Sequence, residues 1–267
     1  MRLITWLVGA AIAVLIAWST PHVWAIRSQA LKEGRLLAAL GAAKKPQGAI
    51  TVRAFVATGA GGYQGPLAAV DPGLVAELKP FPVILSLAGC GWAHDTQDLP
   101  KRFVLLSAHE DPERLQRPIL PRACSDRDAV AIRRALSEQL DVLVAEVGRH
   151  PWLDHTRVVL RASGEAGPLA AAYTGKLSGR VIVDEPCLVR WQTIENGAPM
   201  VLLFSAPAAR AQRPATTIAP FDCRPLPRPA FPAGVAVAEF KSWPGPPVPI
   251  SSEMSDTRRK AFAAFLR

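Results

Sequence analysis

Short apolar runs alternate with helical periodicity through most of the chain. Nearly continuous apolar runs predict strands that are covered on both faces of a sheet. They are residues 50–58, 81–87, 102–106, 158–160, 181–183, 200–204 and 235–240. Apolar side chains three and four residues apart predict a long amphipathic helix over 126–148, and a shorter helix is expected over 168–173. This alternation favours a single α/β domain over 49–267, with a mostly parallel sheet and helices on both faces.

The N-terminus has a different pattern. Arg2 precedes an apolar run from Leu3 to Trp18, and small residues follow up to Ala25. Residues 1–25 therefore predict either a secretory signal cleaved after Ala25 or an uncleaved membrane anchor. Residues 26–48 predict a helical tether. Either form implies an exported protein, which is periplasmic or is anchored in the membrane and faces the periplasm.

The charge and composition narrow the range of partners. The formal net charge is +9, but the cations are scattered and accompany neither zinc-finger spacing nor an RNA-binding aromatic motif. No nucleic-acid partner is therefore expected, and a basic surface facing an anionic membrane is the favoured interpretation. The expected partner is a small molecule or an envelope protein, with possible membrane association through the N-terminal segment. No cofactor or metal is expected, because His94 and His109 lack metal-ligand spacing.

Four segments carry motif-like sequences in a fixed order. They are Ala88-Gly89-Cys90-Gly91, Arg149-His150-Pro151-Trp152-Leu153-Asp154, Ala162-Ser163-Gly164-Glu165-Ala166-Gly167 and Ser242-Trp243-Pro244-Gly245. Together they resemble the dienelactone hydrolases of the α/β-hydrolase superfamily. The resemblance implies an α/β-hydrolase fold in which Gly89, Cys90 and Gly91 form the oxyanion loop.

The three positions that match the family's catalytic triad lack its chemistry. Gly164 stands at the nucleophile, Ala208 at the acid and Val248 at the histidine. No histidine follows His155, although the base follows the nucleophile and the acid in this fold. The resemblance therefore implies a degenerate triad, and the leading hypothesis is an inactive binding or scaffolding pseudoenzyme.

The alternative hypothesis is a weak or non-standard ester or lactone hydrolase. Ser163 lies one residue before the nucleophile position and would act with a non-standard base such as His109. A local one-residue shift of the turn would be needed to bring Ser163 into place.

Four cysteines in an exported chain predict disulfides, and three pairings are possible. Their positions after neighbouring elements favour Cys187–Cys223 first and Cys90–Cys124 second. A nucleophilic Cys90 is a lesser alternative, because no activating base is evident.

Overall fold

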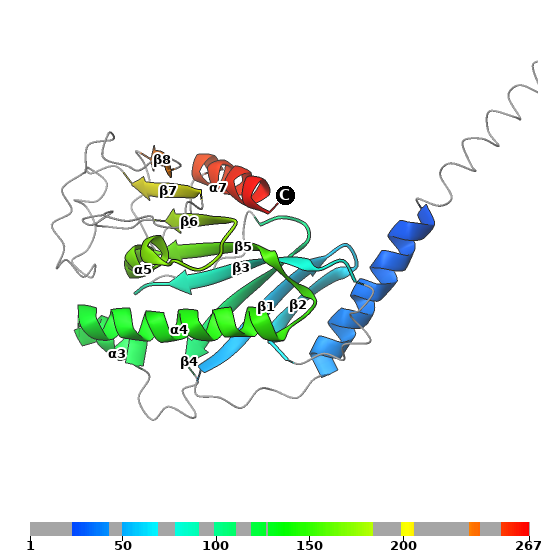
Figure 1. The fold of residues 1–267 in the computed structure, drawn as a ribbon, viewed down its shortest axis with the longest axis horizontal. Helices are drawn as coiled ribbons and strands as arrows, with labels where there is room; N and C mark the ends of the chain where they lie inside the picture. Colours follow the sequence, from blue (N-terminus) through cyan, green and yellow to red (C-terminus); the bar gives the residue numbers. More distant parts are fainter. Residues whose placement is uncertain are drawn as a thin grey trace, which may run out of the picture.

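The computed structural model describes residues 23–42, 50–68, 78–90, 99–110, 119–126, 128–183, 199–205, 235–240 and 252–266 (Figure 1). Within them lies one sheet with the strand order β2-β1-β4-β3-β5-β6-β7-β8. The strands are β1 (Ile50–Thr58), β2 (Gly61–Pro66), β3 (Phe81–Ala88), β4 (Phe103–Glu110), β5 (Leu153–Ser163), β6 (Gly179–Val183), β7 (Met200–Ser205) and β8 (Val235–Phe240).

The sheet is parallel from β4 to β8, and its two remaining strands, β1 and β2, are joined by antiparallel pairing. Strand β1 pairs antiparallel with both β2 and β4, and each remaining neighbouring pair is parallel. Every residue of β3 is buried, as its continuous apolar sequence predicts for a central strand. The carboxyl ends of the parallel strands therefore meet at one edge of the sheet, where α/β proteins place their ligand sites.

Helices cover both faces of this sheet (Figure 1). They are α3 (Ile119–Asp126), α4 (Ala129–Arg149), α5 (Gly167–Ala172), α7 (Ser252–Phe265) and an N-terminal helix over residues 23–42. Helix α4 packs against one face, and α7 packs against the other through Phe262. The Asp128 carboxylate caps α4 by accepting hydrogen bonds from the backbone N–H groups of Val130 and Ala131, both at 3.0 Å.

The architecture confirms the predicted α/β-hydrolase fold. The strand predicted over 235–240 has the expected bounds, whereas β5 begins at Leu153, five residues before its predicted start. Three elements carry no apolar pattern strong enough to predict them: β2, α3 and α7. Strand β2 is Gly-rich and pairs only with β1, so tertiary pairing rather than local preference forms it.

The N-terminal segment is described from residue 23 onward. The helix over 23–42 overlaps the predicted tether, and Leu36 and Leu40 are buried in the same core as α4. No helix among the described residues combines the length and apolarity that a membrane span needs. The apolar run from Leu3 to Trp18 lies outside the described residues, so the predicted signal or anchor and its cleavage remain predictions.

Candidate functional site

The turn after β5 lies at the carboxyl edge of the sheet. Gly164 has a φ of +56° and begins the one-turn 3-10 helix Gly164–Ala166, which leads directly into α5. This left-handed conformation suits a residue without a Cβ atom. The chain thus makes a sharp strand-to-helix turn at Gly164, and no side chain projects from the turning residue.

Ser163 lies at the end of β5 and is only 3% exposed. Its hydroxyl donates a hydrogen bond to the Leu87 carbonyl oxygen of the neighbouring strand at 3.4 Å. Its backbone carbonyl accepts a second hydrogen bond from the Gly89 N–H at 2.9 Å. These contacts hold the hydroxyl within the sheet rather than above the strand ends, where a ligand would bind.

The loop after β3 contacts the residue that follows the turn. The Cys90 N–H donates a hydrogen bond to Glu165 Oε2 at 2.7 Å. A Cβ atom on Gly89 would lie 2.6 Å from Glu165 N and 2.8 Å from Ser163 O, so only glycine fits this close approach. Two predicted oxyanion-loop residues, Gly89 and Cys90, therefore lie beside the turn, while Gly91 is outside the described residues.

Glu165 is the site residue to which the sequence assigned no role. The signal was a carboxylate directly after the turn glycine, but its partner Cys90 is 75 residues away. Only the parallel pairing of β3 with β5, which sets Ala88 beside Ser163, brings the two together.

A disulfide joins this loop to the helical layer. Cys90 and Cys124 are bonded, with an S–S distance of 2.02 Å and a Cα–Cα distance of 5.6 Å. The bond links the end of β3 to α3 and confirms the pairing that the sequence ranked second. A disulfide-bonded Cys90 has no free thiol, so its nucleophilic role is wrong in this state. Cys187 and Cys223 lie outside the described residues, and their pairing remains a prediction.

His109 lies near the carboxyl end of β4. Its Nε2 atom is 2.9 Å from Ser107 Oγ, in a hydrogen bond between residues on the same face of the strand. Burial, and then the Arg53 guanidinium, lower the pKa of His109 below its ordinary value, which favours a neutral imidazole at pH 7. Strand β3 separates β4 from β5, so the backbones of His109 and Ser163 are roughly 10 Å apart.

The two other described histidines lie near the start of β5, at the opposite end of the strand from Ser163. His150 is buried in the turn before β5, where it contacts Glu146 Oε2 at 3.1 Å, and His155 is exposed on β5. Ala208, Val248 and His94 lie outside the described residues. No cluster of three metal-ligating side chains occurs in the part of the chain that the structure describes.

Comparisons with known proteins concern the fold alone. No family model and no curated protein matches the chain. Among solved structures, a carboxylesterase from Bacillus cereus is 16% identical, with a TM-score of 0.42, and the match covers 69% of this chain and 89% of that one. A Paenibacillus sp. R4 acetyl xylan esterase is 12% identical, with a TM-score of 0.40, covering 82% and 86%.

A bacterial heroin esterase is 13% identical, with a TM-score of 0.38, and the match covers 91% of this chain and 92% of that one. Because these similarities are distant, the fold is assigned from the strand order and from the helices that cover the two faces of the sheet. On those observations, the chain has an α/β-hydrolase fold.

Proposed function

We propose that this protein is a binding or scaffolding pseudoenzyme, a divergent relative of the dienelactone hydrolases. The observation that carries the proposal is the turn after β5. The turning residue is Gly164, which offers no nucleophile, and the adjacent Ser163 hydroxyl is buried against the Leu87 carbonyl. A serine mechanism needs a hydroxyl exposed at the top of this turn and within reach of an imidazole.

The oxyanion donor supports the same proposal. In α/β-hydrolases, two backbone N–H groups stabilise the negative oxygen of the transition state, one from the residue after the nucleophile and one from the preceding loop. Here the loop donor, Cys90 N–H, is already bonded to the Glu165 carboxylate. A substrate oxygen would have to displace a negatively charged acceptor from this donor.

The sequence supplies the remaining support. The family's acid and histidine positions carry Ala208 and Val248, and no histidine follows His155. The proposed role is the binding of a small molecule or an envelope protein at the carboxyl edge of the sheet, on the periplasmic side of the membrane. The carboxyl edge is the place where α/β folds bind ligands, because strand topology sets that position independently of the catalytic residues.

A second candidate function is weak ester or lactone hydrolysis, as in the esterases named above. The contact between His109 and Ser107 favours it, because a neutral imidazole accepts a hydroxyl proton. Ser107 is buried, so a substrate would need a local rearrangement to reach it. Ser163 with His109 would need a larger one, because the two residues lie on strands separated by β3.

The two functions are separated by an ester turnover assay with a fluorophosphonate labelling assay. The purified full chain is incubated with p-nitrophenyl butyrate and with the probe, beside Ser163→Ala, Ser107→Ala and His109→Gln. Ser178→Ala, which removes a surface hydroxyl, is the matched control. Pseudoenzyme behaviour predicts turnover at the buffer rate and no labelling in any of them. Turnover or labelling that is lost in Ser163→Ala, alone or together with His109→Gln, or in Ser107→Ala together with His109→Gln, would establish a hydrolase if Ser178→Ala retains it.

A further inference from the structure

The N-terminal helix over residues 23–42 is fastened to the body by its inner face. Leu36 and Leu40 enter the core, and Glu33 is only 3% exposed although it carries a charge. An isolated carboxylate at such a position would be strongly unfavourable, so its partners define how the helix is held.

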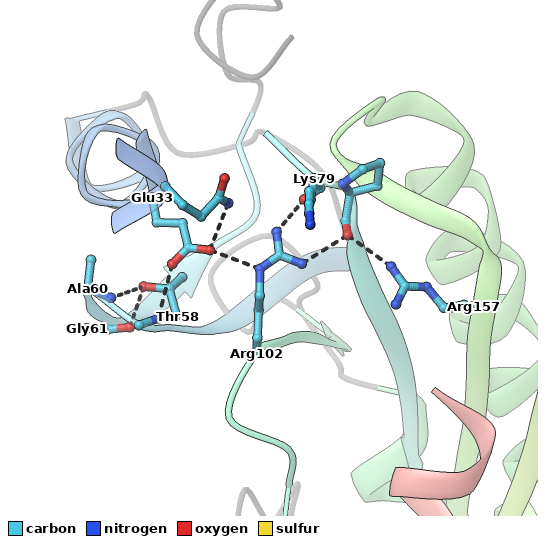
Figure 2. A network of polar contacts seen from close by, with 10 residues as sticks. Glu33, Thr58, Ala60, Gly61, Lys79, Arg102 and Arg157 are labelled. Atoms are coloured by element: carbon cyan, nitrogen blue, oxygen red, sulfur yellow. Dashed lines mark hydrogen bonds and ion pairs between the residues drawn. The ribbon is translucent and has the colours of Figure 1, made fainter. Parts of the chain in front are cut away.

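Figure 2 shows these partners. Glu33 Oε1 contacts Arg102 Nε at 2.9 Å, and Glu33 Oε2 accepts a hydrogen bond from the Gly59 N–H at 3.1 Å. Arg102 also donates hydrogen bonds to the carbonyls of Lys79 and Pro80, and its guanidinium lies 3.8 Å from the centre of the Phe81 ring. The helix is thus bonded to Gly59 after β1 and to Arg102 before β4, and Arg102 in turn is bonded to the residues before β3, which fixes the direction of the helix relative to the sheet.

The outer face of the same helix is apolar and cationic. Trp24 is 75% exposed and Leu31 is 70% exposed, and a separation of seven residues places them on one side of the helix. Arg27 and Arg35 are exposed on this side as well. Glu33 is the only acidic residue between 23 and 42, and it is buried against Arg102. The exposed surface therefore combines an aromatic ring, an aliphatic side chain and positive charge, without a carboxylate.

We infer that this outer face lies on an anionic phospholipid surface, while the Glu33–Arg102 contact holds the hydrolase-fold body at a set orientation beside it. Tryptophan favours the membrane interface, and arginine side chains are attracted to anionic headgroups. The apolar run from Leu3 to Trp18 precedes this helix in the sequence. A segment of that composition also favours contact with lipid, so a membrane is the surface that fits both segments. The membrane contact is independent of what the carboxyl edge of the sheet binds.

Hydroxyl-radical footprinting of the full chain tests the contact. The chain is reconstituted in nanodiscs of phosphatidylglycerol or of phosphatidylcholine, and oxidation is located by mass spectrometry. Trp24 and Leu31 are expected to be protected severalfold in phosphatidylglycerol relative to detergent, and less in phosphatidylcholine. Val130, which is 79% exposed on α4, is the internal control and keeps its reactivity. The inference would be overturned if the reactivities of Trp24 and Leu31, like that of Val130, were the same in detergent and in both lipids.

Two variants and a mass measurement complete the test. Arg27→Glu with Arg35→Glu is expected to remove the difference between the two lipids, whereas Arg134→Glu on the exposed face of α4 is expected to keep it. Protection in detergent that rises with protein concentration would indicate a second copy as the occupant and contradict the membrane contact. The intact mass of the chain extracted from membranes is expected to match a chain that retains Trp24. A mass that matches a chain beginning after Ala25 would also contradict the membrane contact.

Discussion

Two carboxylates, at different edges of the same sheet, each accept a hydrogen bond from a backbone N–H group. Glu33 receives the Gly59 N–H at 3.1 Å beside the start of β4, and Glu165 receives the Cys90 N–H at 2.7 Å beyond the end of β3. At the first edge, Arg102 neutralises the charge, and the N-terminal helix is fixed as a result. At the second edge, the carboxylate occupies the Cys90 N–H, which is the donor of the proposed oxyanion loop. The same chemical group thus fixes a helix at one edge and occupies a proposed ligand-binding position at the other.

The largest predicted effect comes from removing the disulfide that lies beside Glu165. Replacing Cys90 and Cys124 together by alanine opens a link between residues 34 positions apart. Chain-entropy arguments predict a loss of about 3–4 kcal/mol in the free energy of unfolding. Urea denaturation of the variant and the parent chain, both without reductant, measures it. A loss below about 1 kcal/mol would mean that the link contributes little to holding the Cys90 loop.

Breaking the Glu33–Arg102 contact tests the other edge. Glu33→Ala leaves the Arg102 guanidinium without this carboxylate and is expected to cost about 3 kcal/mol, the lower end for a buried pair, because Arg102 is partly exposed. The matched control is Glu138→Ala, which breaks an exposed pair with Arg134 at the same distance of 2.9 Å. That variant is expected to lose about 0.5 kcal/mol or less. Equal losses in the two variants would show that burial does not strengthen the Glu33 contact.

Glu165→Ala measures how strongly the carboxyl edge depends on its own carboxylate. Removal leaves the Cys90 N–H without this acceptor, which costs about 1–3 kcal/mol where water cannot replace it. Glu165→Gln keeps an acceptor oxygen and is expected to lose less. Thermal and urea denaturation of both variants give the order. A Glu165→Ala variant as stable as the parent chain would mean that water replaces the carboxylate readily, so the donor is accessible to a ligand.

The smallest effect is a pH dependence at the carboxyl edge. Burial and then Arg53 lower the pKa of His109, so the unfolded chain takes up a proton near pH 6.5 before the folded chain does. Protonation therefore favours unfolding: the contribution of His109 is intact above about pH 6.5, and it declines as the pH falls toward the folded-state pKa. His109→Gln is expected to flatten the decline between about pH 7.5 and 5.5 in urea denaturation. An unchanged slope in this variant would contradict the lowered pKa.

Much of the fold was predictable because the spacing of apolar residues along the chain differs between buried strands and amphipathic helices. The buried strand over 81–87 and the long helix after Asp126 follow from apolar spacing. Strand β2 and helices α3 and α7 were missed because their sequences have weaker patterns, and packing against the rest of the domain forms them. Of the two predicted disulfides, Cys90–Cys124 is confirmed, and Cys187–Cys223 lies outside the described residues and stays a prediction.

The sequence by itself determined which side chains residues 156–267, including residue 164, can contribute to the carboxyl edge of the sheet. A glycine at residue 164 has no side chain in any conformation, and no packing can supply a histidine after His155. Only the tertiary structure decided where the remaining polar groups act. Glu165 meets Cys90 across 75 residues and Glu33 meets Arg102 across 69, because strand pairing and helix docking, rather than local spacing, bring distant segments together.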